Sequence, residues 1–123
     1  MTSTPYHLPA QDLPFSKAVR IGNTVHLSGV LALDANGNLA GDSTAEQTRA
    51  VLESIATVLS EMGSGLDRVV KVTVWLADIG DLAEFNAEYI RHFSGAFPVR
   101  SCVQAKLAKG ARVEIEAMAL AGG

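Results

Sequence analysis

Apolar and polar residues alternate along several short segments of the chain, and this period of two predicts β-strands. Near the N-terminus, residues 18–21 and 24–28 form two such segments, and the Gly-Asn pair between them suits a tight hairpin turn. A third short strand is expected at 31–33, before a turn-rich Asp-Ala-Asn-Gly-Asn stretch. The first third of the chain is therefore predicted to form a β-hairpin followed by a short strand.

A period of three to four residues predicts two helices further along. Ser43 and Glu46 form a capping box, in which each side chain satisfies a free backbone N–H, and Gly63 is placed to end this first helix. Asp81 and Glu84 repeat the capping pattern for the second helix. The apolar stripes comprise Val51, Leu52, Ile55, Val58, Leu59 and Met62 in the first helix, and Leu82, Phe85, Tyr89 and Phe93 in the second.

The remaining apolar segments predict three more strands. Residues 69–76 are rich in β-branched side chains and are typical of a central strand. Residues 99–107 and 112–120 flank a short loop and are expected to pair as a second hairpin. The order ββ(β)-α-β-α-ββ predicts a single α+β domain over residues 1–123, with both helices on one face of a sheet.

The face of the sheet away from the helices is expected to carry mixed side chains. By alternation it would display a mixture such as Lys71, Thr73 and Trp75, or Arg100, Cys102 and Gln104, beside Glu114, Glu116 and Met118. A face that is neither fully polar nor fully apolar is typical of a subunit interface that contains a site. On this ground we expect an oligomer.

Composition favours a soluble domain in a reducing compartment. The 123 residues are 48% hydrophobic, which is enough to bury a core without a covalent staple. Cys102 is the only cysteine, so no intramolecular disulfide can form, and no Cys/His spacing indicates a metal site. The first residues do not resemble an export signal, and no stretch approaches the roughly 20 apolar residues of a membrane span. We therefore expect a cytoplasmic protein without a membrane partner.

Charge and motifs argue against several function classes. Ten basic and thirteen acidic residues give a net charge of −3, and the basic residues are scattered, so nucleic acid is not an expected partner. The sequence contains no dinucleotide-binding, phosphate-loop, zinc-protease or serine-hydrolase motif. No cofactor and no metal are therefore expected.

Several polar residues interrupt the apolar pattern. Asn86 falls within the apolar arc of the second helix, where it would be either a buried structural amide or a ligand-facing group. Arg100 has planar donors that suit a carboxylate, but an ion pair with Glu114 or Glu116 across the hairpin is the favoured interpretation. Ser28, which precedes a glycine, could hold a small anion, although a turn or bulge is the commoner use of such a pair.

Glu114 and Glu116 share one face of the last strand, because side chains alternate along it. Two such carboxylates raise each other's proton affinity, which suits acid–base chemistry, although a solvated or paired face is commoner. A four-residue loop would put Arg100 and Glu116 on opposite faces of the hairpin, and an odd loop length would put them together. Cys102 is interpreted as a small strand residue, because no histidine lies in a recognisable partner motif.

Six short segments carry a family resemblance that extends from about Leu13 to Ala119. They are Pro14-Phe15-Ser16-Lys17-Ala18-Val19, Leu27-Ser28-Gly29, Val70-Lys71-Val72-Thr73-Val74, Phe85-Asn86-Ala87-Glu88-Tyr89, Phe97-Pro98-Val99-Arg100-Ser101-Cys102-Val103 and Val113-Glu114-Ile115-Glu116-Ala117. In this order and spacing they resemble the reactive-intermediate deaminase family, which is also called RidA or YjgF and labelled endoribonuclease L-PSP.

The resemblance implies a chorismate-mutase-like α+β fold, a mixed sheet with two helices on one face, assembled as a homotrimer with sites between subunits. It also implies cofactor-free hydrolysis of 2-aminoacrylate-type enamines and their imine tautomers to 2-keto acids and ammonia. The expected ligand is then a small 2-imino or 2-keto acid. Two other functions stay open: a non-catalytic carboxylate binder or chaperone-like trimer and, less favoured by the charge, a ribonuclease or translation inhibitor.

The resemblance also implies roles for single residues. Arg100 would clamp the substrate carboxylate, and Glu116 would orient or deprotonate the attacking water. The backbone of Cys102 would help to hold water and substrate, while Ser28 and Asn86 would line the pocket.

Two positions depart from the family pattern. Phe15 stands where the family usually has tyrosine, and Val30 stands where glutamine is usual. Both changes remove a polar group, so we expect a more apolar pocket than is typical. Glu114 receives no role from the resemblance.

Overall fold

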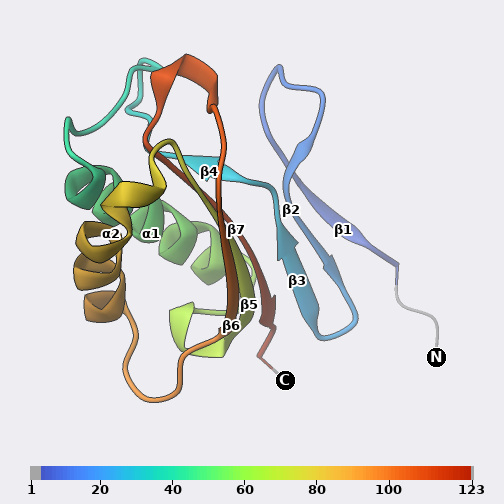
Figure 1. Cartoon of the computed structure of the whole chain (residues 1–123). Helices are drawn as coiled ribbons and strands as arrows, with labels where there is room; N and C mark the ends of the chain where they lie inside the picture. The colour runs from blue at the N-terminus through green and yellow to red at the C-terminus, as the bar shows by residue number, and fades with distance from the viewer. Residues whose placement is uncertain (1–3, 123) are drawn as a thin grey trace.

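Seven strands form one mixed sheet, and both helices pack on the same face of it (Figure 1). The computed structural model describes residues 4–122. The strands lie in the order β1-β2-β3-β7-β5-β6, and the short β4 also pairs with β7. Their bounds are β1 Tyr6–Pro9, β2 Ser16–Ile21, β3 Thr24–Leu27, β4 Val30–Leu31, β5 Val69–Leu76, β6 Val99–Gln104 and β7 Val113–Leu120; the helices are α1 Thr44–Glu61 and α2 Leu82–Tyr89. The predicted α+β layering is confirmed.

The N-terminal hairpin is confirmed and is extended by one unexpected strand. β2 and β3 pair as far as Ile21 and Thr24, and Gly22 has a φ of 59° in the turn, which glycine adopts without a Cβ clash. β1 adds to the outer edge of β2. It ends in Pro9, which only a sheet edge tolerates, and it is too short to show a clear alternation. The predicted strand at 31–33 is β4, which is shorter and begins one residue earlier.

The two C-terminal strands do not pair with each other, so the predicted second hairpin is wrong. β5 lies between them, parallel to β6 and antiparallel to β7. The chain passes from β5 to β6 through α2, and a helical crossover of this kind returns the chain parallel to the strand that it left. β7 pairs on its other side with β3 and β4, so both of its edges are used. β6 also ends earlier than predicted, at Gln104.

The register places the polar side chains of β6 and β7 on opposite faces of the sheet. Val72 of β5 pairs with Arg100, and the next residue, Thr73, pairs with Glu116. Because paired residues share a face and successive residues alternate, Arg100 lies on the helix side and Glu116 on the open side. Arg100, Cys102 and Gln104 of β6 were predicted to lie on the face away from the helices, and this prediction is wrong. The same prediction holds for the β5 set, Lys71, Thr73 and Trp75, which lies there with both glutamates.

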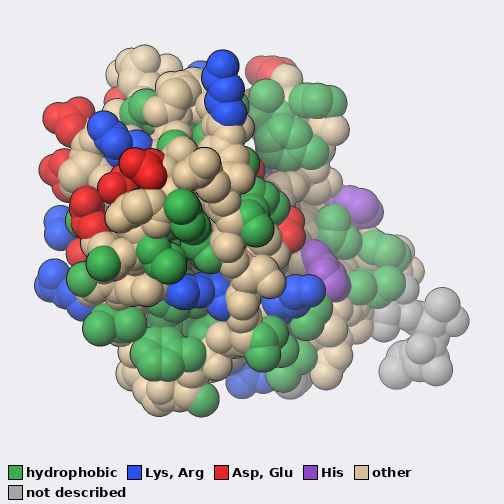
Figure 2. Space-filling view, in the orientation of Figure 1, with side chains coloured by type: hydrophobic (Ala, Val, Ile, Leu, Met, Phe, Trp, Pro, Cys, Tyr) green, Lys and Arg blue, Asp and Glu red, His purple; other side chains and the backbone are tan. Residues whose placement is uncertain are grey.

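The core lies between the helices and the covered face of the sheet. Val51, Leu52, Ile55 and Leu59 from the inner side of α1 are each at most 1% exposed, as the helical stripe predicts. On the outside, acidic and basic side chains are interspersed over the part of the molecule where the helices lie (Figure 2).

The capping box of α1 is confirmed. Ser43 Oγ accepts a hydrogen bond from the Glu46 N–H at 3.0 Å, and Glu46 Oε1 accepts one from the Ser43 N–H at 3.1 Å. The helix ends just before Gly63, whose φ of 77° is the left-handed conformation expected after a helix C-terminus.

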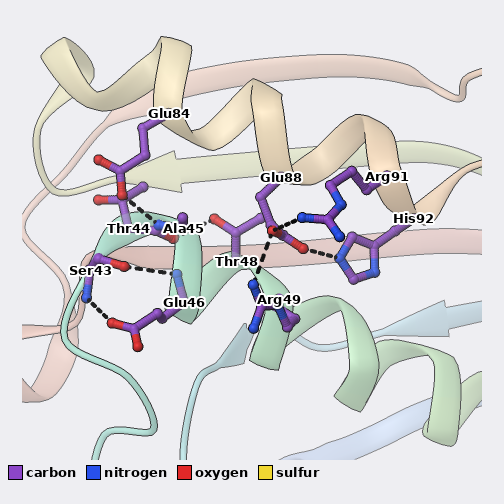
Figure 3. A network of polar contacts seen from close by, with 10 residues as sticks. All are labelled: Ser43, Thr44, Ala45, Glu46, Thr48, Arg49, Glu84, Glu88, Arg91 and His92. Carbon is purple, nitrogen blue, oxygen red and sulfur yellow. Dashed lines mark hydrogen bonds and ion pairs between the residues drawn. The ribbon is translucent and has the colours of Figure 1, made fainter.

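The predicted capping of α2 by Asp81 and Glu84 is wrong, because both carboxylates contact α1 instead. Asp81 Oδ2 accepts a hydrogen bond from Thr44 Oγ1 at 2.8 Å. Glu84 Oε2 accepts one from the backbone N–H of Ala45 at 2.7 Å, as Figure 3 shows. The free N–H groups and the positive dipole end of α1 favour carboxylates at this place. These contacts fix α2 against the N-terminus of α1, and so help to set the position of the residues that α2 presents to β6.

Candidate functional site

Two aromatic rings and one amide surround the guanidinium of Arg100 at the start of β6. Its Nη1 donates a hydrogen bond to Asn86 Oδ1 at 2.8 Å. The guanidinium carbon lies 5.1 Å from the centre of the Tyr89 ring and 5.6 Å from that of Phe85, which is within the range of cation–π attraction. Phe85 and Tyr89 are four residues apart and therefore occupy one side of α2. The register of β6 brings Arg100 to that side.

Arg100 also borders a pocket with largely apolar walls. The pocket has a volume of ≈ 320 Å³ and is lined by Asn86, Tyr89, Ile90, Phe97, Pro98 and Arg100. Apart from Asn86, no acceptor within residues 4–122 takes a hydrogen bond from the guanidinium. A planar fork with free donors beside a pocket is well suited to bind a carboxylate.

The ion pair between Arg100 and Glu114 or Glu116, which the sequence favours, is wrong. Within the described chain, Arg100 has no ion pair with either carboxylate. The cause is the strand order, because β5 lies between β6 and β7 and the register turns the side chains to opposite faces. Asn86 takes the place of the acidic partner. Its side chain is half-buried and its amide oxygen is the acceptor that fixes one edge of the guanidinium.

Cys102 lies two residues after Arg100, on the same face of β6, and packs partly against the core. Burial raises the pKa of its thiol, and the nearby positive charge of Arg100 opposes this only in part. The thiol is therefore protonated at neutral pH and is a poor nucleophile. His92 contacts Glu88 and His7 contacts Ser16, so neither of these rings serves as a base for the cysteine. These contacts favour the interpretation of Cys102 as a small strand residue.

The two glutamates of β7 lie together on the open face, as predicted. Glu116 borders a hollow of ≈ 310 Å³, which is also lined by His26, Leu27, Lys71, Thr73, Ala117 and Met118. The carboxylate of Glu114 packs against Gly29 so closely that a Cβ at position 29 would collide with it. Burial, and then the charge of Glu116, raise the pKa of Glu114. The open face thus presents an acidic pair in which Glu114 holds a proton more readily than an exposed glutamate.

Phe15 and Ser28 lie in a third pocket, of ≈ 190 Å³, beside the start of β4. Gly29, Val30 and the α1 residues Ser54 and Val58 also line it. Ser28 Oγ donates a hydrogen bond to the backbone oxygen of Ser16 at 2.6 Å, so its proton is already used, and no donor within residues 4–122 occupies its lone pairs. The walls include the exposed Phe15 ring and Val30.

The predicted site residues therefore fall into separate groups within one chain. Arg100, Asn86 and Cys102 lie on the helix side of the sheet, and Glu116 lies on the open side. Sequence reasoning does not reveal the second role of Phe85 and Tyr89, which appear there only as core residues. One signal in the sequence could have indicated this role: Asn86 lies between Phe85 and Tyr89 on α2, so a partner of its amide would also contact those rings.

The described residues show neither a metal-binding cluster nor a membrane-spanning helix. Between residues 4 and 122, no group of three or more His, Cys, Asp or Glu side chains is placed to hold a metal ion. No helix in the same range is long and apolar enough to cross a membrane.

Comparisons with known proteins give a consistent result. The model of the family described as endoribonuclease L-PSP matches residues 6–121. A protein of Bos taurus named 2-iminobutanoate/2-iminopropanoate deaminase is 42% identical over 116 residues, which are 93% of this chain and 85% of the relative. RutC family protein UK114 of Drosophila melanogaster is 43% identical over 111 residues, or 89% of this chain and 80% of the relative.

Solved structures match over the whole length. The crystal structure of NMB1025 from Neisseria meningitidis, a member of the YjgF protein family, superposes with a TM-score of 0.90 at 31% sequence identity. The match covers 100% of this chain and 99% of the other. The single sheet with two helices on one face is thus the architecture of these relatives as well.

Proposed function

The chain belongs to the endoribonuclease L-PSP family, also known as the YjgF/RidA family, and we propose that it is an enamine/imine deaminase. Its substrates would be 2-aminoacrylate-type intermediates and their 2-imino acid tautomers, and its products 2-keto acids and ammonia. The names of relatives about 40% identical to it support this activity. The observation that carries the proposal is the guanidinium of Arg100, fixed by Asn86 at 2.8 Å and otherwise free to bind a carboxylate beside a pocket.

The site would be completed by a second copy of the chain in a homotrimer. Arg100 and Glu116 lie on opposite faces of one sheet, so a single chain does not bring the clamp and the acid–base group together. The open face also carries exposed apolar side chains, with Val99 65% and Val103 46% exposed, as a surface covered by another subunit would. A neighbouring copy would bring its open face, with Glu116, to the pocket beside Arg100.

The chemistry needs only binding and proton transfer. Arg100 would hold the substrate carboxylate through two parallel hydrogen bonds, which fixes the imine carbon. The backbone of Cys102 would help to hold the water. Glu116 would accept a proton from this water as its oxygen attacks the imine carbon, and would return the proton to the nitrogen. Glu116 would then carry the proton of the new hydroxyl to the nitrogen as well, and ammonia leaves as the carbonyl forms, so that one imine and one water give one keto acid and one ammonia.

The pocket around Phe15 and Ser28 would determine which side chains are accepted. The Phe15 ring and the Val30 side chain offer apolar contact, and neither has a hydrogen-bond donor. We infer that this version accepts imines with short alkyl side chains, because Phe15 and Val30 offer them apolar contact.

A non-catalytic carboxylate binder is the second candidate, and one observation favours it. The clamp at Arg100 is formed within one chain, whereas Glu116 is on the other face, so binding does not require the residue that turnover requires. A ribonuclease is less favoured, because the net charge is −3 and charges of both signs are mixed on the face seen in Figure 2.

The test is keto-acid formation from 2-iminopropionate and 2-iminobutyrate generated in situ. We expect acceleration by the purified protein, its loss in Arg100→Ala, and full activity in the exposed control Lys106→Ala. Glu116→Gln should keep affinity for the keto acid and lose turnover. No acceleration with any imino acid would reject the enzyme, and unchanged turnover in Glu116→Gln would reject the role of that carboxylate. Binding of a keto acid without turnover in the wild-type protein would support the binder.

A further inference from the structure

The aromatic residues of α2 continue past the site as a row of touching rings. The ring centres of Phe85 and Tyr89 are 5.3 Å apart, those of Tyr89 and Phe93 are 4.7 Å apart, and those of Phe93 and Phe97 are 6.2 Å apart. Only the first two rings also lie under the guanidinium of Arg100. The row therefore has one end under the guanidinium, and Phe93 and Phe97 continue it away from that contact.

An exposed arginine side chain normally samples many rotamers, and binding a carboxylate would have to restrict them. Arg100 is exposed, yet a ring face at 5.1 Å and an amide oxygen at 2.8 Å restrict both the plane and the edge of its guanidinium. Tyr89 itself is 3% exposed and belongs to the buried core beneath α2, so its own position is fixed. Because the ring is held in place, it can restrict the orientation of the guanidinium before a ligand binds, which lowers the entropy cost of binding.

We propose that Tyr89 is a positioning residue of the carboxylate clamp: its ring holds the Arg100 guanidinium in the plane and direction that a substrate carboxylate requires. This rests on the proposed function only in assuming that Arg100 binds the carboxylate. The hydroxyl of Tyr89 is not what acts, because it is buried and has no hydrogen-bond partner among residues 4–122. The ring acts through the attraction between its negative face and the cation.

The test compares Tyr89→Leu, which removes the ring, with Tyr89→Phe, which keeps it. The matched control is Phe93→Leu, which removes a ring of the same row that does not lie under Arg100. We expect Tyr89→Leu to raise the KM for 2-iminobutyrate, and the Kd for 2-oxobutyrate, by about tenfold with little change in kcat. Tyr89→Phe and Phe93→Leu should stay within about twofold of the wild-type values.

Two further measurements separate positioning from a loss of packing. In an Arg100→Gln background, Tyr89→Leu should no longer change the Kd for 2-oxobutyrate. The Kd for the uncharged amide of 2-oxobutyric acid should be unaffected by Tyr89→Leu in the wild-type background. If Tyr89→Leu weakens acid and amide equally, or weakens binding to the same extent without Arg100, the proposal is overturned. Unchanged keto-acid affinity in a folded Tyr89→Leu protein overturns it as well.

A variant that fails to fold does not end the test. Phenylalanines with one, two and three ring fluorines at position 89 keep the shape of the ring and progressively weaken its negative face. Keto-acid affinity should fall with each fluorine, and a flat series rejects the proposal. Because affinity for a keto acid is read without turnover, a protein that lacks deaminase activity still gives an answer about Tyr89.

Discussion

Arg100 and Glu116 both lie next to β5 in the sheet, yet they face opposite sides of it. Val72 pairs with Arg100 and Thr73 pairs with Glu116, so one step along β5 separates the helix side from the open side. Two groups that a single reaction would need are thus presented to two different neighbours. This arrangement requires either that the groups do not cooperate or that another copy of the chain unites them.

Mixing two inactive variants distinguishes these possibilities. Arg100→Ala and Glu116→Gln should each be inactive alone, but mixed oligomers would contain some sites with Arg100 from one subunit and Glu116 from the next. After unfolding and refolding an equimolar mixture, random assembly should restore about a quarter of the wild-type activity per subunit. The control is each variant refolded by itself. A mixture that stays inactive, although native mass spectrometry shows mixed trimers, contradicts a site shared between subunits.

Asn86, which accepts the hydrogen bond from Arg100, is uncharged, and we expect this to be important for binding the substrate carboxylate. Asn86→Asp would keep an oxygen at 2.8 Å from Nη1 but would neutralise the guanidinium and repel a substrate carboxylate. We expect its KM to rise by more than about tenfold, and that of Asn86→Ala by only a few fold, with kcat less affected in both. Steady-state kinetics with 2-iminobutyrate measures this. Equal KM values for the two variants would show that the charge at position 86 is irrelevant.

The sequence predicts the elements of this fold better than it predicts their neighbours. The capping box at Ser43 and the Gly-Asn turn are local features, and both occur where their residues indicate. Strand pairing depends on long-range contacts, and the short connection after Leu107 suggested a hairpin although β7 instead joins β3, β4 and β5. The same error caused the wrong ion pair of Arg100. Period-two alternation could tell which residues of β6 share a face, but not which face it was.

The buried carboxylate of Glu88 should contribute pH-dependent stability at the seam between the helices. Glu88 is 6% exposed and contacts His92 at 2.6 Å, Arg49 at 3.5 Å and Arg91 at 3.7 Å (Figure 3). Burial alone would raise its pKa, but the hydrogen bonds from His92 and Arg49 and the charge of Arg49 outweigh burial, so the pKa of Glu88 is lowered. A carboxyl whose pKa is lower in the folded state stabilises that state when it is ionised.

This stabilisation is therefore complete above the pKa of the unfolded chain, about 4.3, and is lost as the pH falls through the lower pKa of the folded state. Glu88→Gln should cost about 2 kcal/mol of unfolding free energy at pH 7, because it removes the buried negative charge that Arg49, Arg91 and His92 contact. The difference from wild type should shrink as the pH falls below about 4. Urea unfolding between pH 3 and 7 measures it, with the exposed Glu53→Gln of α1 as the control. A difference that is constant over this range would contradict the assignment.

Cys102 provides a test of whether the family chemistry here needs a thiol. Burial raises its pKa, so iodoacetamide should modify it more slowly at pH 8 than it modifies a free cysteine, because less thiolate is present.

Cys102→Ala should keep kcat within about twofold, since only the backbone of this residue is assigned to the site. It should lose about 1 kcal/mol of stability, because the side chain packs partly against the core. The matched control is Ser101→Ala, one residue earlier and on the open face of β6. Loss of turnover in a folded Cys102→Ala protein, with Ser101→Ala active, would show that the sulfur takes part in the reaction and that a thiol nucleophile has to be added to the mechanism.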